Sequence, residues 1–186
     1  VYHVLDNKYY NYNKAENYKI ISFEQNYDNQ ELPQLPNNIE VLLLKSPKFN
    51  NPLDNFHLSE NLRIIDMYNN QSFNQPLDCL KTLDRLEELY LSFSFNYPLD
   101  NLPKNLKILK VSAEFNHPVN NLPDDLEILD LASRFNHPIT NLPSKLKTLK
   151  LGYIIGDKFN YPLDNLPPNL EKLVLIGFAF NQTLIN

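Results

Sequence analysis

Cysteine, glycine and tryptophan are scarce in this sequence. Its 186 residues include one cysteine, Cys79, three glycines and no tryptophan. A single cysteine cannot form a disulfide framework or a cysteine-based metal site. It fits a reducing compartment, so we expect a cytoplasmic protein. The shortage of glycine argues against a fold rich in two-residue β-hairpins, because such turns need backbone angles that glycine adopts most easily.

Positive charge and long apolar runs are lacking as well. Lys and Arg number 17 against 22 Asp and Glu, which gives a net charge of −5. We therefore expect no nucleic-acid partner, because phosphate backbones are bound by basic surfaces. No apolar stretch approaches the ~20 residues of a membrane helix, so we expect no membrane contact. No secretory signal opens the sequence, and its start at Val1 rather than Met predicts further residues upstream.

Proline, by contrast, is abundant, and it recurs at fixed positions within a tandem repeat. Phe-Asn pairs begin at residues 49, 73, 95, 115, 135, 159 and 180, so successive copies lie 20 to 24 residues apart. This period falls within the range of leucine-rich repeats. The clearest copy, Phe115 to Arg134, reads FNHPVNNLPDDLEILDLASR.

Each copy contains a short strand signal of the form L-x-x-L-x-L, such as Leu126, Leu129 and Leu131. The last apolar positions alternate with other residues, which is the period of a strand. The same pattern occurs at about residues 18–23, which predicts an eighth strand without a preceding Phe-Asn. One copy cannot bury its own apolar face, so the strands should stack into a single parallel sheet.

The predicted fold is a leucine-rich-repeat-like solenoid with one parallel sheet of about eight short strands on its concave face. Such proteins are placed in the α/β class by convention, but this chain should be mostly β. Two prolines per copy, such as Pro118 and Pro123, fix φ and remove backbone donors, so the convex side should be extended or polyproline-like with little helix. Residues 18–186 should form one solenoid, made of a capping strand and seven repeats. Residues 1–17 are an atypical N-terminal segment or the remnant of an upstream domain, and Val1–Leu5 is either an extra strand or part of that remnant.

Several residue columns are assigned to the scaffold. The Phe column should form a stacked aromatic spine in the core. The Asn column after it should form a buried ladder whose amides bond to neighbouring backbone, and a second Asn column should do the same. The residue after the first apolar strand position alternates in charge along the chain, as Lys19, Glu40, Arg63, Glu87, Lys107, Glu127, Lys147 and Glu171. These charges should pair between stacked strands and fix the register of the repeats.

The sequence offers little catalytic or metal-binding chemistry. His117 and His137 share one repeat position, but two histidines without a third ligand make a poor zinc site, and a stacked polar ladder is the better interpretation. An Asp column is interrupted by Asn120 and Thr140, which argues against a carbohydrate-active solenoid with clustered carboxylates. Neither a nucleophile-elbow motif nor a Gly-rich phosphate loop occurs. We therefore predict no enzyme, no catalytic residue, no metal and no cofactor.

The concave face is the predicted protein-binding surface. Apolar and aromatic residues gather at its exposed positions, which is typical of a patch that binds another protein, although β-branched residues also simply favour strands. The predicted contact residues are Val41, Leu43, Ile64, Asp66, Tyr68, Tyr90, Ile108, Lys110, Ile128, Asp130 and Lys150. An insertion at Gly152–Lys158 is either a bulge or a recognition loop that presents Tyr153, Ile154 and Ile155.

The unit F-N-x-P-L-x-N-L-P-x-x-L-x-x-L-x-L resembles the FNIP repeat, a leucine-rich-repeat relative found in social amoebae and in giant viruses of amoebae. The resemblance covers Phe49 to Asn186, and six copies keep F-N-x-P intact. Because proteins of this family often carry an F-box before the repeats, the resemblance implies the substrate-recognition part of a cullin-type ubiquitin-ligase adaptor. The site of action would be the host cytoplasm if the protein is viral. Residues 1–17 do not resemble an F-box, which would have to lie upstream of Val1.

Two functions remain open at this stage. The first is a non-enzymatic protein–protein interaction module whose partner the sequence does not name. The second is a self-associating scaffold that forms a homodimer through the C-terminal edge of the solenoid, Phe178–Asn186.

Overall fold

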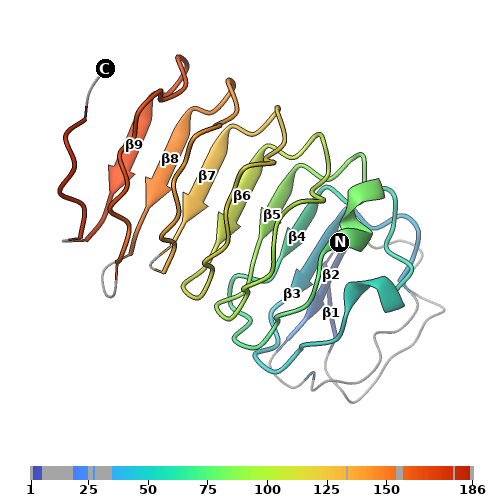
Figure 1. Ribbon diagram of the computed structural model, residues 1–186. Coiled ribbons are helices and arrows are strands. Elements are labelled where there is room, and N and C mark those ends of the chain that lie inside the picture. The colour runs from blue at the N-terminus through green and yellow to red at the C-terminus, as the bar shows by residue number, and fades with distance from the viewer. Residues whose placement is uncertain are drawn as a thin grey trace.

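A computed structural model describes residues 2–5, 19–24, 27, 35–132, 134–153, 157–177 and 179–184. They form one sheet of nine parallel strands that follow one another in sequence order (Figure 1). The strands are β1 (Tyr2–Leu5), β2 (Ile20–Phe23), β3 (Val41–Leu44), β4 (Ile64–Asp66), β5 (Glu88–Tyr90), β6 (Ile108–Val111), β7 (Ile128–Leu131), β8 (Thr148–Leu151) and β9 (Lys172–Leu175). None of the described segments forms a helix long and apolar enough to cross a membrane.

The predicted leucine-rich-repeat-like solenoid is confirmed, and its sheet has one strand more than the eight expected. The additional strand is β1, which pairs in parallel with β2. The other strands coincide with the L-x-x-L-x-L signals because alternate side chains enter the core. In β7, for example, Leu129 and Leu131 are fully buried while Ile128 and Asp130 are only partly buried.

The described part of the chain contains no α-helix, but two short 3-10 helices lie outside the sheet. They are η2 (Leu53–Asn55) and η3 (Asp78–Thr82), in the first two repeats. In these repeats the segment NLPKNL of the third copy is replaced by NFHLSENL and CLKTLDRL, which lack the proline and are two residues longer. In the second repeat Lys81 stands at the place of that proline, inside η3, so the N–H group and the freedom in φ that proline lacks are kept there. The helix η2 ends before this place.

The Phe column forms the predicted aromatic spine. Consecutive rings from Phe49 to Phe180 lie nearly parallel, with centroids 5.9 to 6.5 Å apart and interplanar angles of 4 to 17°. These distances are typical of offset stacking. The rings from Phe49 to Phe159 are at most 2% exposed, so the spine lies inside the core along the length of the solenoid.

The first asparagine ladder exists, but the prediction that it is buried is wrong. The backbone N–H of Asn116 donates to Oδ1 of Asn96 at 2.9 Å, and that of Asn136 donates to Oδ1 of Asn116 at 3.0 Å. Asn96 and Asn116 are nevertheless exposed. Each Asn directly follows a Phe that points into the core, and neighbouring side chains of an extended backbone point to opposite sides. The ladder therefore runs along the outside of the turns.

The alternating charges form ion pairs between neighbouring repeats. Glu87 bonds to Arg63 on one side at 2.6 Å and to Lys107 on the other at 2.8 Å. Glu127 bonds to Lys147 at 2.6 Å. The hydrogen bonds that Glu87 accepts from Lys107 and Arg63 hold the pKa of its carboxyl below the ordinary value. The charge row thus stabilises the register that the sequence predicts.

We expect Phe115→Ala to lower the free energy of unfolding by about 3–5 kcal/mol, because its buried ring stacks between Phe95 and Phe135. Phe93→Ala is the control, since that ring is 50% exposed and its removal should cost less than about 1 kcal/mol. Urea unfolding followed by circular dichroism measures both variants. Equal losses would show that the spine does not carry the stability of the repeats.

Glu87→Gln should lower the stability by at most about 1 kcal/mol at pH 7, because the ion pairs that it removes are solvent-exposed. Since folding lowers the pKa of Glu87, its contribution is present above the ordinary value of 4.5 and is lost as the pH falls through the lowered pKa. Urea unfolding at pH 7 and pH 3 should therefore show a difference between wild type and variant that closes in acid. Glu60→Gln, which removes a carboxylate without an ion pair in the described contacts, should behave like wild type at both values.

Candidate functional site

The face of the sheet turned away from the Phe spine, called the open face below, contains the predicted columns as rows of register partners. The first row, at the start of the strands, contains Ile20, Val41, Ile64, Glu88, Ile108, Ile128, Thr148 and Lys172. The second row contains Ser22, Leu43, Asp66, Tyr90, Lys110, Asp130, Lys150 and Val174. The strand register therefore brings the predicted contact residues of β3 to β8 together on one surface.

The predicted contact residues differ in exposure. Val41, Ile64, Ile108 and Ile128 are only partly buried, so a row of aliphatic side chains remains accessible on the open face. Tyr68, just beyond the end of β4, is 51% exposed and is the most accessible of the predicted residues. An accessible aliphatic row beside an exposed tyrosine is typical of a surface that excludes water when a partner binds.

Two carboxylates of the second row form ion pairs, one with a lysine beyond the strand end and one with a lysine of the same row. Lys45 Nζ lies 2.5 Å from Asp66 Oδ2, and Lys150 Nζ lies 3.0 Å from Asp130 Oδ2. Lys110 has no ion pair among the described contacts, and its Nζ lies 5.1 Å from the centroid of the Tyr90 ring.

Tyr90 is held in place from within its own strand. Its hydroxyl donates to Glu88 Oε2 at 2.7 Å. Burial, together with this bond to a carboxylate, raises the pKa of Tyr90 well above its ordinary value. The hydroxyl therefore remains a hydrogen-bond donor at any physiological pH, and the ring stays oriented beneath Lys110.

A groove of about 160 Å³ lies where the strands of the open face end. Its lining includes three exposed aromatic side chains, Tyr68, Phe93 and Tyr153, with exposed fractions of 51, 50 and 46%. Small residues such as Ser112 and Ala132 also line it. Of the predicted recognition loop, Tyr153 therefore lies in this groove, whereas Ile154 and Ile155 lie outside the described residues.

Phe93 is the groove residue that the sequence patterns do not single out. It lies two residues after Leu91, the last leucine of the strand signal of its repeat, and the corresponding residue of the next repeat is Ala113. A large aromatic residue where the next repeat has alanine is the signal that marks it.

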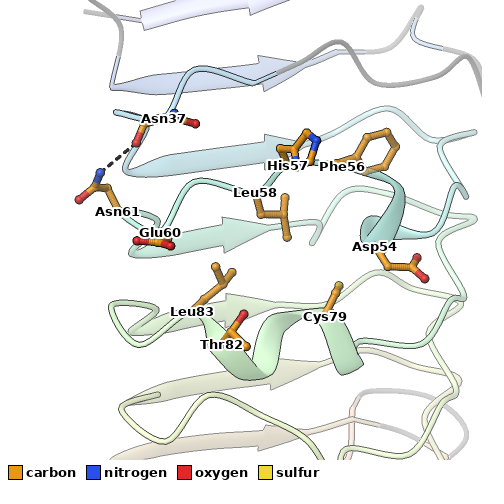
Figure 2. Close-up of a pocket in the computed structure, with 10 residues that line it drawn as sticks. All are labelled: Asn37, Asp54, Phe56, His57, Leu58, Glu60, Asn61, Cys79, Thr82 and Leu83. Carbon is orange, nitrogen blue, oxygen red and sulfur yellow. Dashed lines mark hydrogen bonds between the residues drawn. The ribbon is translucent and has the colours of Figure 1, made fainter.

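A second, more open pocket of about 730 Å³ lies beside the two 3-10 helices (Figure 2). Its residues come from the turn after η2, which carries Phe56 and His57, and from η3, which carries Cys79 (Figure 2). Burial raises the pKa of the Cys79 thiol to about 11, so the thiol stays protonated at neutral pH. No hydrogen bond between His57 and Cys79 is present in the described part of the structure. The pocket therefore lacks an activated nucleophile.

The remaining polar columns bond within the scaffold. His117 and His137 place Nε2 at 2.9 and 3.0 Å from a backbone carbonyl oxygen of the preceding repeat, which is the ladder arrangement expected from the sequence. In the second Asn column, Asn121 donates to Asp100 of the preceding repeat at 3.1 Å. Within the described residues, no group of three or more His, Cys, Asp or Glu side chains is placed to hold a metal ion.

The comparisons with known proteins agree with the repeat pattern. Residues 115–153 match the family model described as FNIP Repeat. The matched range spans two consecutive copies of the repeat, which are thus similar to FNIP repeats. Its fold is similar to the crystal structure of CroV588, described as a novel circular LRR protein, with a TM-score of 0.71 and 24% sequence identity. That match covers 91% of this chain and 28% of CroV588, so the chain spans little more than a quarter of that protein, and the likeness shows the fold alone. No curated protein matches the sequence.

The matched FNIP repeats contain part of the open face and one end of the groove. Ile128 and Asp130 lie on β7, Lys150 lies on β8, and Tyr153 follows β8 within the matched range. The family pattern specifies the core positions of these repeats, such as Phe135 and Leu149. The residues on the open face lie at positions between them that differ from repeat to repeat within this chain, such as Glu88 beside Ile108 and Ile128 beside Thr148.

We expect Cys79 to react slowly with iodoacetamide at pH 8. A thiol with a pKa of about 11 forms about a hundredfold less thiolate than one with the ordinary value of 9.0, and the thiolate is the reactive form. Unfolding in urea should raise the rate by roughly that factor, which mass spectrometry of the alkylated protein measures. Equal rates for folded and unfolded chains would show that the fold does not shield the thiol.

Proposed function

We propose that this chain is a non-enzymatic protein-binding module that uses its open face. The FNIP and leucine-rich-repeat fold in general suggests an interaction or scaffold module. The observation that carries the proposal is the accessible aliphatic row, in which Val41 with Ile64 and Ile108 with Ile128 lie on either side of Glu88. Side chains on the opposite side of the same strands, such as Leu129, are fully buried, so the row does not belong to the core.

The polar groups on the turns of the scaffold also favour the open face as the binding surface. The turns are occupied by the Asn, His and Asp columns, whose polar groups already bond to the neighbouring repeat, as His117 and Asn121 do. The aliphatic row has no comparable partner in the described residues. A protein surface that covers it would remove apolar area from water, which is the main driving force for association.

A finer form of the proposal assigns the chain to substrate recognition in an F-box-type ubiquitin-ligase adaptor in the cytoplasm, or in the host cytoplasm if the protein is viral. The support is the family resemblance of the repeats, together with a sequence whose single cysteine suits a reducing compartment. The F-box that would contact cullin-complex subunits would lie upstream of Val1.

The proposal is tested by affinity capture from a lysate of a social amoeba, read by mass spectrometry. One bait is the wild-type chain, and the second carries Ile64→Asp, Tyr90→Ala and Ile108→Asp. We expect a partner that wild type retains and the triple variant loses by at least about tenfold, because charges on the aliphatic row oppose its burial. Cullin-complex subunits in the eluate of a longer chain that includes the upstream residues would support the adaptor role.

A matched control keeps the result interpretable. The variant Tyr161→Ala changes an exposed residue that lies outside both the open face and the C-terminal edge, with an exposed fraction of 36%. It should retain the partner, and all baits should melt at the same temperature. Capture that is unchanged by the triple variant would rule out the open face as the binding surface.

A second candidate is self-association through the C-terminal edge, and the state of β9 favours it. The leucines of its core side, Leu173 and Leu175, are only partly buried, whereas Leu149 and Leu151 of β8 are at most 2% exposed. Phe180, the last ring of the spine, is also only partly buried. Sedimentation velocity over a concentration series distinguishes this candidate, since Leu173→Asp should abolish any dimer while the open-face triple variant should not.

A further inference from the structure

The groove at the end of the strands differs from the rest of the open face in both shape and charge. Phe93 follows β5 and Tyr153 follows β8 at equivalent places, so the two rings are separated by three strand spacings, roughly 14 Å. The lining residues between them include Ser112, Ala113 and Ala132. With large rings at both ends and small side chains between them, the groove is a trough that runs across the strands.

The size of this trough suits one large side chain. Its volume of about 160 Å³ is close to the roughly 150 Å³ of a cavity that holds a benzene molecule. Because the trough is open to solvent, the backbone of a ligand could pass over it while one aromatic or large aliphatic side chain enters between Phe93 and Tyr153. Such a side chain would pack against one of these rings and against the small side chains of the lining, such as Ser112 and Ala132.

The charges around the trough leave one amine without a carboxylate. Lys110, Asp130 and Lys150 occupy neighbouring strands in register. Asp130 bonds to Lys150 at 3.0 Å, whereas Lys110 has only the ring of Tyr90 near its amine among the described contacts. The trough is thus lined by two amines and one carboxylate, in a chain whose net charge is −5. A carboxylate of a ligand would pair with Lys110 as Asp130 pairs with Lys150.

We propose that this groove binds an extended acidic peptide segment, with a carboxylate on Lys110 and an aromatic or large aliphatic side chain between Phe93 and Tyr153. The inference rests on the proposed function and narrows it to a ligand chemistry and a place. Lys150 strengthens the same preference, because its amine lies 5.6 Å from the centroid of the Tyr153 ring at the end of the trough. The positive charge of the groove therefore lies beside its apolar contacts, which is the arrangement that an acidic peptide with an apolar anchor requires.

The test is a selection from a phage-displayed library of random linear peptides against the immobilised wild-type chain. We expect enrichment of sequences with Asp or Glu close to an aromatic residue or leucine. A selection against Lys110→Glu should lose the acidic residues and gain Lys or Arg. Lys81→Glu, which reverses an exposed lysine of η3 outside the open face, should select the same peptides as wild type.

The most enriched peptide is then synthesised and its Kd is measured by fluorescence anisotropy. Lys110→Met keeps the aliphatic stem and removes only the charge, so it separates electrostatics from misfolding. This variant and Tyr153→Ala should each weaken binding by about tenfold, and raising the salt concentration should weaken the wild type. All variants should keep the wild-type melting temperature.

The outcomes separate this inference from the proposed function. Two results would overturn the groove inference and leave the open face as the binding surface. The first is a set of selected peptides without acidic residues. The second is a peptide that binds Lys110→Met and Tyr153→Ala as well as wild type but fails to bind Ile64→Asp/Ile108→Asp. If no peptide is enriched, or binding is indifferent to both sets of variants, the groove inference is overturned, and the capture experiment with the triple variant decides separately whether the open face binds a protein.

Discussion

The structure depends on contacts between repeats, because no repeat has a core of its own. Each turn of the chain contributes one phenylalanine and a few leucines, and these are buried only when the next turn covers them. The stacked rings of Phe95, Phe115 and Phe135 are the plainest example, since each ring lies between the rings of its neighbours. The other columns form bonds between turns that are already stacked in this way. Ion pairs such as Glu87 with Lys107 and the asparagine bonds hold the stacked turns in register but bury little apolar surface.

Repetition explains why so much of the fold could be predicted from the sequence. A column that occurs seven times separates core positions such as Leu129 from open-face positions such as Ile128, and the strand register follows from the repeat alignment. The features that were missed are those outside the repeat pattern. The role of Tyr2–Leu5 stayed open because no repeat precedes it. The 3-10 helix at Asp78–Thr82 forms where later repeats have a proline, and the absence of this proline is visible only when the first repeats are compared with the later ones.

The candidate site likewise has one part that the repeat pattern predicts and one part that it does not predict. The strand register places the predicted contact residues on one face, and this register follows from the repeat alignment. The groove was not predicted, because it depends on Phe93, a single departure from the pattern, and on Tyr153 within an insertion. The exposure of Asn116 was also missed, since a conserved spacing along the chain identifies a column without showing on which side of the turn it lies. Features that depend on differences between repeats thus need the three-dimensional structure, and these differences are what give one solenoid a specific binding surface.

The asparagine bonds also give the molecule a direction. In each step a later repeat donates its backbone N–H and an earlier repeat accepts with its side chain, as from Asn136 to Asn116. The ladder therefore has the same donor-to-acceptor direction at every step, and its two directions along the solenoid are not equivalent. Two identical ends brought together about a twofold axis could not extend it. Any assembly that continues the ladder must join unlike ends, which is a heterologous contact, and such contacts produce rings when they close and filaments when they do not.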